Sequence, residues 1–150
     1  MSMMQTAPET VEAAVEAVFG SPSDPMPVVE ARAAELLGPE AMVWEADAVT
    51  VIFSYVGKSA EAVLGYPVSR WTEEPTFWAD VVLHDDDREG AITYCVAETA
   101  ACRDHAFVYR ARAADGRVVP LRDYVQVITD AAGKPSLLRG VMVVVSEDES

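Results

Sequence analysis

Hydrophobic positions near the amino terminus follow the pattern of an amphipathic helix. Between residues 9 and 19, apolar side chains lie along one side of a helical projection: Val11, Val15, Val18 and Phe19. Thr10 can cap this helix and Gly20 can end it. A segment with three prolines then breaks the pattern, and a second short helix is predicted over residues 28–37.

From Ala41 onward, the pattern becomes that of strands. Segments rich in β-branched and aromatic residues predict five strands: 42–46, 49–55, 107–113, 118–129 and 137–145. Asp47 and Ala48 would join the first two as a tight turn. Helices are predicted between the second and third strands: 60–64 with Ser59 as its cap, a segment opened by Pro75, and 86–101. We therefore expect an α+β fold, a five-stranded antiparallel sheet with helices packed on one face.

Length and composition favour one such domain. The chain has 150 residues, 51% of them hydrophobic, which is enough for one substantial core. We expect an N-terminal helical flank at residues 1–39, the α+β domain at 40–146 and an acidic tail at 147–150, which has the composition of a disordered terminus.

The charge of the chain excludes several partners. A formal net charge of −14 disfavours nucleic acid and anionic lipid surfaces, whose binding needs clustered Lys and Arg. No apolar run approaches the roughly 18 residues of a membrane span, and the first residues lack a signal peptide's features, so a soluble, cytoplasmic protein is expected. Cys95 and Cys102 would lie about 10.5 Å apart along one helix, which predicts two reduced, buried thiols.

Candidate chemistry concentrates around His84. An imidazole followed by three aspartates, Asp85 to Asp87, has the groups of a general base or a metal ligand. Consecutive aspartates point in different directions, however, and the segment lacks the glycine and closing glutamate of a calcium loop. An acidic cap at a helix start explains these residues better. We find no nucleophile motif or phosphate loop, so neither an active site nor a metal site is predicted; His105 is expected to be exposed.

Several short motifs occur in an order that resembles a PAS sensor domain of the type with a C-terminal PAC segment. They are the run from Phe53 to Pro67, which ends Leu-Gly-Tyr-Pro, then Phe77-Trp78, His84 to Arg88, Tyr109-Arg110, Asp115-Gly116, and Asp130 to Gly133. The resemblance covers most of the chain after Ala41. It implies a sensory or protein-interaction module of a signal-transduction protein, without enzymatic activity and with a downstream partner or effector domain.

The resemblance also guides expectations about cofactors. Flavin-binding relatives carry an Asn-Cys-Arg-Phe-Leu-Gln run before the long helix, whereas this chain has Trp78 to Leu83 there. Haem-binding relatives commonly take a histidine from the long helix, and the predicted helix contains none; only His84 or Cys95 could substitute. No cofactor is predicted.

Strand parity predicts a largely apolar cavity between the sheet and the long helix, suited to a small apolar ligand. The candidate ligand-binding residues are Phe53, Phe77, Ile92, Cys95, Phe107, Tyr109 and Val125. The same side chains could instead simply fill the core.

Two further alternatives stay open at this point. A small cone-shaped α+β isomerase or hydratase would need an acid inside the cavity, and Asp123, which shares a strand face with Leu121 and Val125, is the candidate. The N-terminal helices could cap the chain's own sheet or bury their apolar sides against a second copy, as flanking helices often do in the family resembled. We predict a homodimer through these helices.

Overall fold

The computed structural model describes residues 10–146. Its elements follow in this order: α1 (Val11–Phe19), α2 (Met26–Leu37), β2 (Met42–Asp47), β3 (Phe53–Val56), α3 (Ser59–Leu64), α4 (Val68–Glu73), the π-helical turn η1 (Trp78–Val82), α5 (Asp85–Ala100), β4 (His105–Arg112), β5 (Val118–Thr129) and β6 (Pro135–Val144). Within this range the strands form one antiparallel sheet in the order β3-β2-β6-β5-β4. The predicted α+β class is confirmed, and the expected tail at 147–150 lies outside the described residues.

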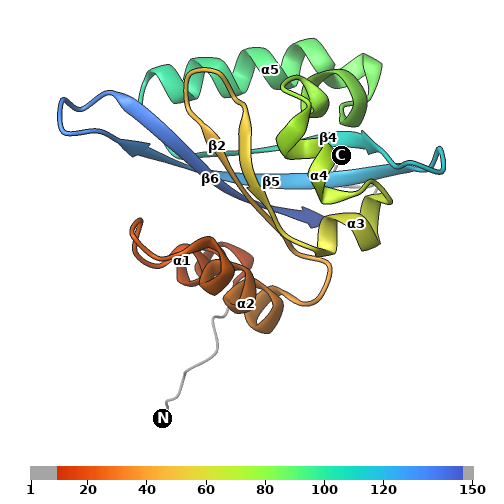
Figure 1. Cartoon of the computed structure of the whole chain (residues 1–150), viewed down its shortest axis with the longest axis horizontal. Coiled ribbons are helices and arrows are strands. Elements are labelled where there is room, and N and C mark those ends of the chain that lie inside the picture. Colours follow the sequence, from red (N-terminus) through yellow and green to blue (C-terminus); the bar gives the residue numbers. More distant parts are fainter. Residues whose placement is uncertain (1–9, 147–150) are drawn as a thin grey trace.

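The main core lies between the sheet and the helices that follow β3. Figure 1 shows α5 above the sheet and α3 and α4 at one end of it, while α1 and α2 lie on the opposite side. The buried side chains of this core are mostly aromatic and branched aliphatic, and Trp71 of α4 is completely buried. Burying such a side chain stabilises the fold by about 1.5–3 kcal/mol, so this layer supplies much of the stability.

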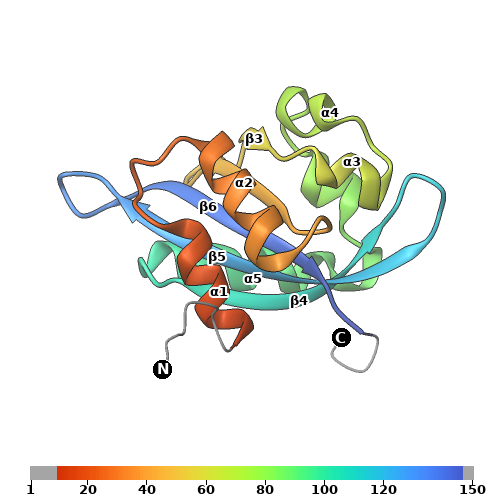
Figure 2. The same ribbon diagram turned by 90° about the horizontal axis from the view of Figure 1, so that it is seen from below.

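The N-terminal helices cover the other face of the sheet. Figure 2 shows α1 and α2 crossing it in front of β5 and β6. Val15, Val18 and Phe19 are buried in a second cluster that includes side chains of the sheet. Thr10 caps α1 by accepting a hydrogen bond from the Ala13 amide at 3.0 Å, as predicted. The apolar stripe therefore packs within its own chain, whereas the homodimer stays a prediction.

One carboxylate ties this N-terminal layer to the rest of the domain. Glu30 of α2 accepts hydrogen bonds from the Tyr55 hydroxyl and, at 2.7 Å, from the backbone amide of Lys58. Burial, together with Glu30, raises the pKa of Tyr55 to about 12, so the phenol stays a donor. The contact holds α2 against β3 and the turn that leads into α3.

The segment after β2 differs from the prediction of a tight turn. The Asp47 carboxylate accepts hydrogen bonds from the amides of Val49 and Thr50, both at 2.8 Å, and the Val51 amide donates to the Asp47 carbonyl at 2.9 Å. These bonds coil the chain, so the strand begins at Phe53 instead of Val49. Val51 has φ 57°, a left-handed conformation that is unfavourable for a β-branched residue.

The predicted helices before α5 also need correction. Helix α4 was not predicted, and the segment after Pro75 forms the π-helical turn η1 at Trp78–Val82. Ser59 does not cap α3, because the helix begins at this residue and its hydroxyl donates to the Ala41 carbonyl at 2.6 Å.

Candidate functional site

A chain of hydrogen bonds runs through the apolar core and ends on one buried carboxyl. Asp123 of β5 is 2% exposed; its Oδ1 accepts from the Trp44 Nε1–H and its Oδ2 from the Tyr109 hydroxyl, both at 2.9 Å. The Tyr109 oxygen in turn accepts from the Trp78 Nε1–H at 3.1 Å. Four elements, β2, η1, β4 and β5, thus contribute to one network, which we call the Asp123 network.

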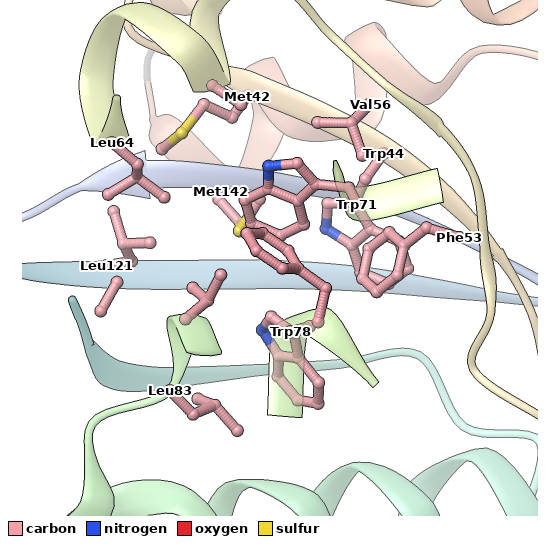
Figure 3. Packing of buried hydrophobic residues seen from close by; sticks show 14 of the residues in the cluster. Met42, Trp44, Phe53, Val56, Leu64, Trp71, Trp78, Leu83, Leu121 and Met142 are labelled. Atoms are coloured by element: carbon pink, nitrogen blue, oxygen red, sulfur yellow. The ribbon is translucent and has the colours of Figure 1, made fainter. Parts of the chain in front are cut away.

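Strand parity explains why these groups meet. Leu121, Asp123 and Val125 alternate along β5 and are all buried, as predicted for one strand face. Asp123 pairs with Met142 of β6 on one side and with Phe107 of β4 on the other. Figure 3 shows Trp44, Trp78 and Met142 among the buried side chains of the same core cluster.

Burial sets the ionisation of the network. It raises the pKa of Asp123 from its ordinary value of 3.8 to about 7, against the two hydrogen bonds, which favour the ionised form. Burial, together with the neighbouring Asp123 charge, raises the pKa of Tyr109 well above its ordinary range. Burial also raises the pKa of the Cys95 thiol to about 11, so this cysteine is a neutral thiol.

Three hollows meet beside this network, and Val51 and Cys95 line all of them. The enclosed hollow next to Asp123 has a volume of about 10 Å³, which is at most the space of one water molecule. Two open hollows of about 180 and 560 Å³ lie along α5. Val51, held in its left-handed conformation, therefore stands between the open hollows and the closed core.

The seven predicted ligand-binding residues divide among these spaces. Four line the enclosed hollow: Phe53, Cys95, Phe107 and Val125. Ile92 joins Cys95 in the wall of the hollow of about 180 Å³, and Tyr109 belongs to the Asp123 network. Phe77 lies elsewhere. Its ring centroid is 5.2 Å from the ring centroid of Trp71, and the Arg70 guanidinium lies 4.6 Å from the centroid of the Phe77 ring.

Sequence reasoning missed some residues of the wall. Trp44, Val51, Trp78 and Leu138 also line the enclosed hollow. Trp44 could have been found, because it alternates with the buried Met42 and Ala46 on β2. Val51 could not, because a strand had been predicted where the chain coils.

His84 orders the start of α5. Its Nδ1 accepts a hydrogen bond from the Asp86 amide at 3.1 Å, which makes it the cap of the helix. Asp87 pairs with the Arg110 guanidinium at 2.7 Å, and that hydrogen bond holds the pKa of Asp87 below its ordinary value. The acidic turn is therefore tied to β4. Within residues 10–146 no group of three His, Cys, Asp or Glu side chains is arranged to hold a metal ion.

Two other predictions in this region were wrong. His105 was expected to be exposed, but it is buried, with its ring centroid 5.6 Å from that of Tyr94 on α5. Cys102 was expected to be buried, but it lies just beyond α5 and is exposed, with φ 58°.

Comparison with known proteins places this architecture in a family. The sequence profile of the PAS fold matches residues 53–142. The N-terminal domain of a diguanylate cyclase with a PAS/PAC sensor from Marinobacter aquaeolei is 34% identical, with a TM-score of 0.65, over 73% of this chain and 99% of that one. No curated protein matches the chain.

Two more distant solved structures share the fold. A sensory box histidine kinase/response regulator from Burkholderia thailandensis E264 is 21% identical, with a TM-score of 0.60, over 78% of this chain and 84% of that one. A light-oxygen-voltage domain studied with a flavin analogue is 16% identical, with a TM-score of 0.66, over 86% of this chain and 91% of that one.

These findings define the chain as a signalling sensor module, and it belongs to the PAS fold family. The alternative of a cone-shaped isomerase or hydratase finds no support among them, although Asp123 does point into the core. Among the described residues, no helix is long and apolar enough to cross a membrane.

Proposed function

We propose that this domain senses a small, largely apolar molecule, held without a covalent bond between the sheet and α5. The observation that carries the proposal is the meeting of three hollows at Val51 and Cys95, directly beside the Asp123 network. A ligand that moves Val51 would reach the indole groups of Trp44 and Trp78, which join β2, η1, β4 and β5 through Asp123. Ligand binding would thereby affect contacts across the sheet.

The domain carries out no catalysis in this proposal. Both Asp123 oxygens already accept hydrogen bonds, and the space beside them is too small for a substrate. A base needs a reacting group within hydrogen-bond reach, and here Trp44 and Tyr109 occupy that position. Asp123 acts as a structural and electrostatic centre of the core.

A resident cofactor does not fit in the enclosed hollow beside the Asp123 network. The enclosed hollow of about 10 Å³ is far smaller than the roughly 300–1,000 Å³ typical of sites for drug-sized ligands. His84 uses its Nδ1 to cap α5, and burial disfavours the Cys95 thiolate that would bind haem iron. These observations support a colourless, reversibly loaded domain.

We propose that the output passes to a partner or effector domain, in the manner of the diguanylate cyclase whose sensor domain is similar. We assign residues 40–146 to the sensor of the PAC-bearing type and residues 1–39 to a helical flank in the cytoplasm. Self-association through this flank would use the exposed Val11, because the rest of the stripe already packs on the sheet. Light scattering should then show a dimer that Val11→Glu returns to a monomer; a monomer at high micromolar concentration refutes this part.

An absorption spectrum of the freshly purified protein, combined with mass spectrometry of its organic extract, tests the ligand proposal. We expect no visible absorption band and a small apolar compound in the extract. A Soret or flavin band at stoichiometric occupancy would overturn the proposal, and a Soret band would direct attention to His84 and Cys95 as haem ligands.

A further inference from the structure

The two open hollows adjoin along one side of α5. They share Val51, Cys95 and Val96 in their walls. The residues of α5 that line them extend from Ile92 to Ala100, about 12 Å along the helix axis. We call this surface the α5 trough. Its larger part, about 560 Å³, lies within the usual size of small-molecule sites.

The middle of the α5 trough exposes apolar side chains to solvent. Val49 is 80% exposed on one wall and Val96 is 55% exposed on the other. Both stand on a chain whose net charge is −14, where the surface is otherwise rich in carboxylates. Exposed apolar side chains that gather in a hollow mark a binding surface better than isolated ones do. An aliphatic chain lying between these valines would remove both from water.

Charged side chains line the α5 trough at one end only. Asp130 and Lys134, in the turn between β5 and β6, are in the wall of the larger hollow, and the residues that line the smaller hollow are uncharged. The Asp130 Oδ1 already accepts hydrogen bonds from the amides of Ala132 and Lys134, at 2.8 and 3.0 Å. The Lys134 ammonium forms no ion pair within residues 10–146, a property it shares with Lys58.

From this placement we propose that the α5 trough binds a linear aliphatic carboxylate. Its chain lies between Val49 and Val96, across Val51, and its carboxylate lies at Lys134. The inference rests on the proposed function and specifies the ligand class and its position outside the closed core. The enclosed hollow cannot admit such a chain while Val51 keeps its position.

The three tryptophans of the chain report the position of a ligand separately. Trp78 lines both the smaller open hollow and the enclosed hollow, Trp44 lines the enclosed hollow, and Trp71 lines none of the three. Their indole N–H signals in a ¹⁵N-labelled sample can be followed by NMR while octanoate is added. We expect the Trp78 signal to shift most and the Trp71 signal to stay in place. Octanol and octylamine serve as probes with the same chain and other head groups.

Two substitutions separate the head group from the chain. Lys134→Gln should weaken octanoate binding about threefold, the size of an exposed ion pair, and leave octanol binding unchanged. Val96→Glu places a charge against the aliphatic chain and should weaken both probes by at least about tenfold. Lys58→Gln and Val28→Glu are the matched controls, because Lys58 is the other lysine without an ion pair and Val28 is an exposed valine on a helix of the opposite face. Neither control should change binding.

The outcomes distinguish this inference from the proposed function. A Trp44 shift as large as that of Trp78, unaffected by Val96→Glu, would place the ligand in the core; it would overturn the inference and leave the sensor proposal standing. Tighter binding of octylamine than of octanoate would overturn the assignment of the head group. No shift with any of the three probes would overturn the inference entirely, while the extract of the purified protein would still decide whether the domain carries another ligand.

Discussion

Replacing Asp123 by Asn should remove most of the pH dependence of stability near neutrality. Asn has nearly the same shape, its oxygen can accept from the Trp44 indole, and its amide can donate to the Tyr109 oxygen. The network therefore keeps its hydrogen bonds and loses its titrating group. The wild-type protein, by contrast, carries a carboxyl whose pKa is about 7 when folded and 3.8 in its ordinary environment.

The sign of the effect follows from these two pKa values. Between them the folded state holds the Asp123 proton and the unfolded state does not, so folding takes up a proton and stability falls as the pH rises. The loss begins above the ordinary pKa of 3.8 and levels off once the pH passes the folded pKa of about 7. From about pH 5.5 to about pH 8, this single group removes about 2 kcal/mol of unfolding free energy.

Urea denaturation, followed by tryptophan fluorescence at several pH values, measures this loss. The wild-type protein should lose about 2 kcal/mol more than Asp123→Asn over the same pH interval, because the other titrating groups are common to both proteins. Asp80→Asn, which changes an exposed aspartate, should behave like the wild type. Equal pH dependence for the wild type and Asp123→Asn would contradict the raised pKa of Asp123, since the carboxyl would then be ionised over the whole interval.

Three further substitutions test the packing. Trp78→Ala should lower the unfolding free energy by about 3–5 kcal/mol in chemical denaturation, and a loss below about 1 kcal/mol would contradict its placement in the core. Glu30→Ala should lower the unfolding free energy by about 1–3 kcal/mol, because two donors lose their acceptor. Glu35→Ala, at an exposed site of the same helix, should leave it nearly unchanged. Equal losses of unfolding free energy in the two variants would contradict the role of Glu30. Val51→Gly should change the unfolding free energy by less than about 1 kcal/mol, because relief of the left-handed strain offsets the lost side chain. Val56→Gly on β3 should lower it much more. Similar losses of unfolding free energy at both sites would contradict the strain at Val51.

Much of the sheet could be predicted from the sequence. The bounds of β5, Val118–Thr129, match the prediction, because a segment rich in β-branched residues lies between two clear turns. Alternation then placed Asp123 on the inner face with Leu121 and Val125. The alternation of side chains between the two faces is a local property of a strand, so it can be predicted without knowledge of the tertiary structure.

The failures lie where tertiary contacts or side-chain hydrogen bonds override the pattern. Val49 to Ile52 have strand-forming composition, yet the Asp47 side chain captures the amides that a strand would use. Helix α4 has six residues and no side-chain cap, so neither hydrophobic periodicity nor a capping residue indicates it in the sequence. Phe77 lies at the start of η1 with helical backbone angles, where strand parity gives no direction. The surface that covers the apolar side of α1 could not be predicted. An apolar stripe indicates that a helix face is buried, but it does not indicate which surface buries it.

Native mass spectrometry of the freshly purified protein shows directly whether the domain holds a small ligand. We expect a population carrying a small non-covalent adduct, which denaturation releases. Cys95→Met, which extends a flexible apolar side chain into the point where the three hollows meet, should lose the adduct while remaining folded. An adduct that persists on denatured protein, or one that Cys95→Met retains at the same occupancy, would contradict reversible binding between the sheet and α5.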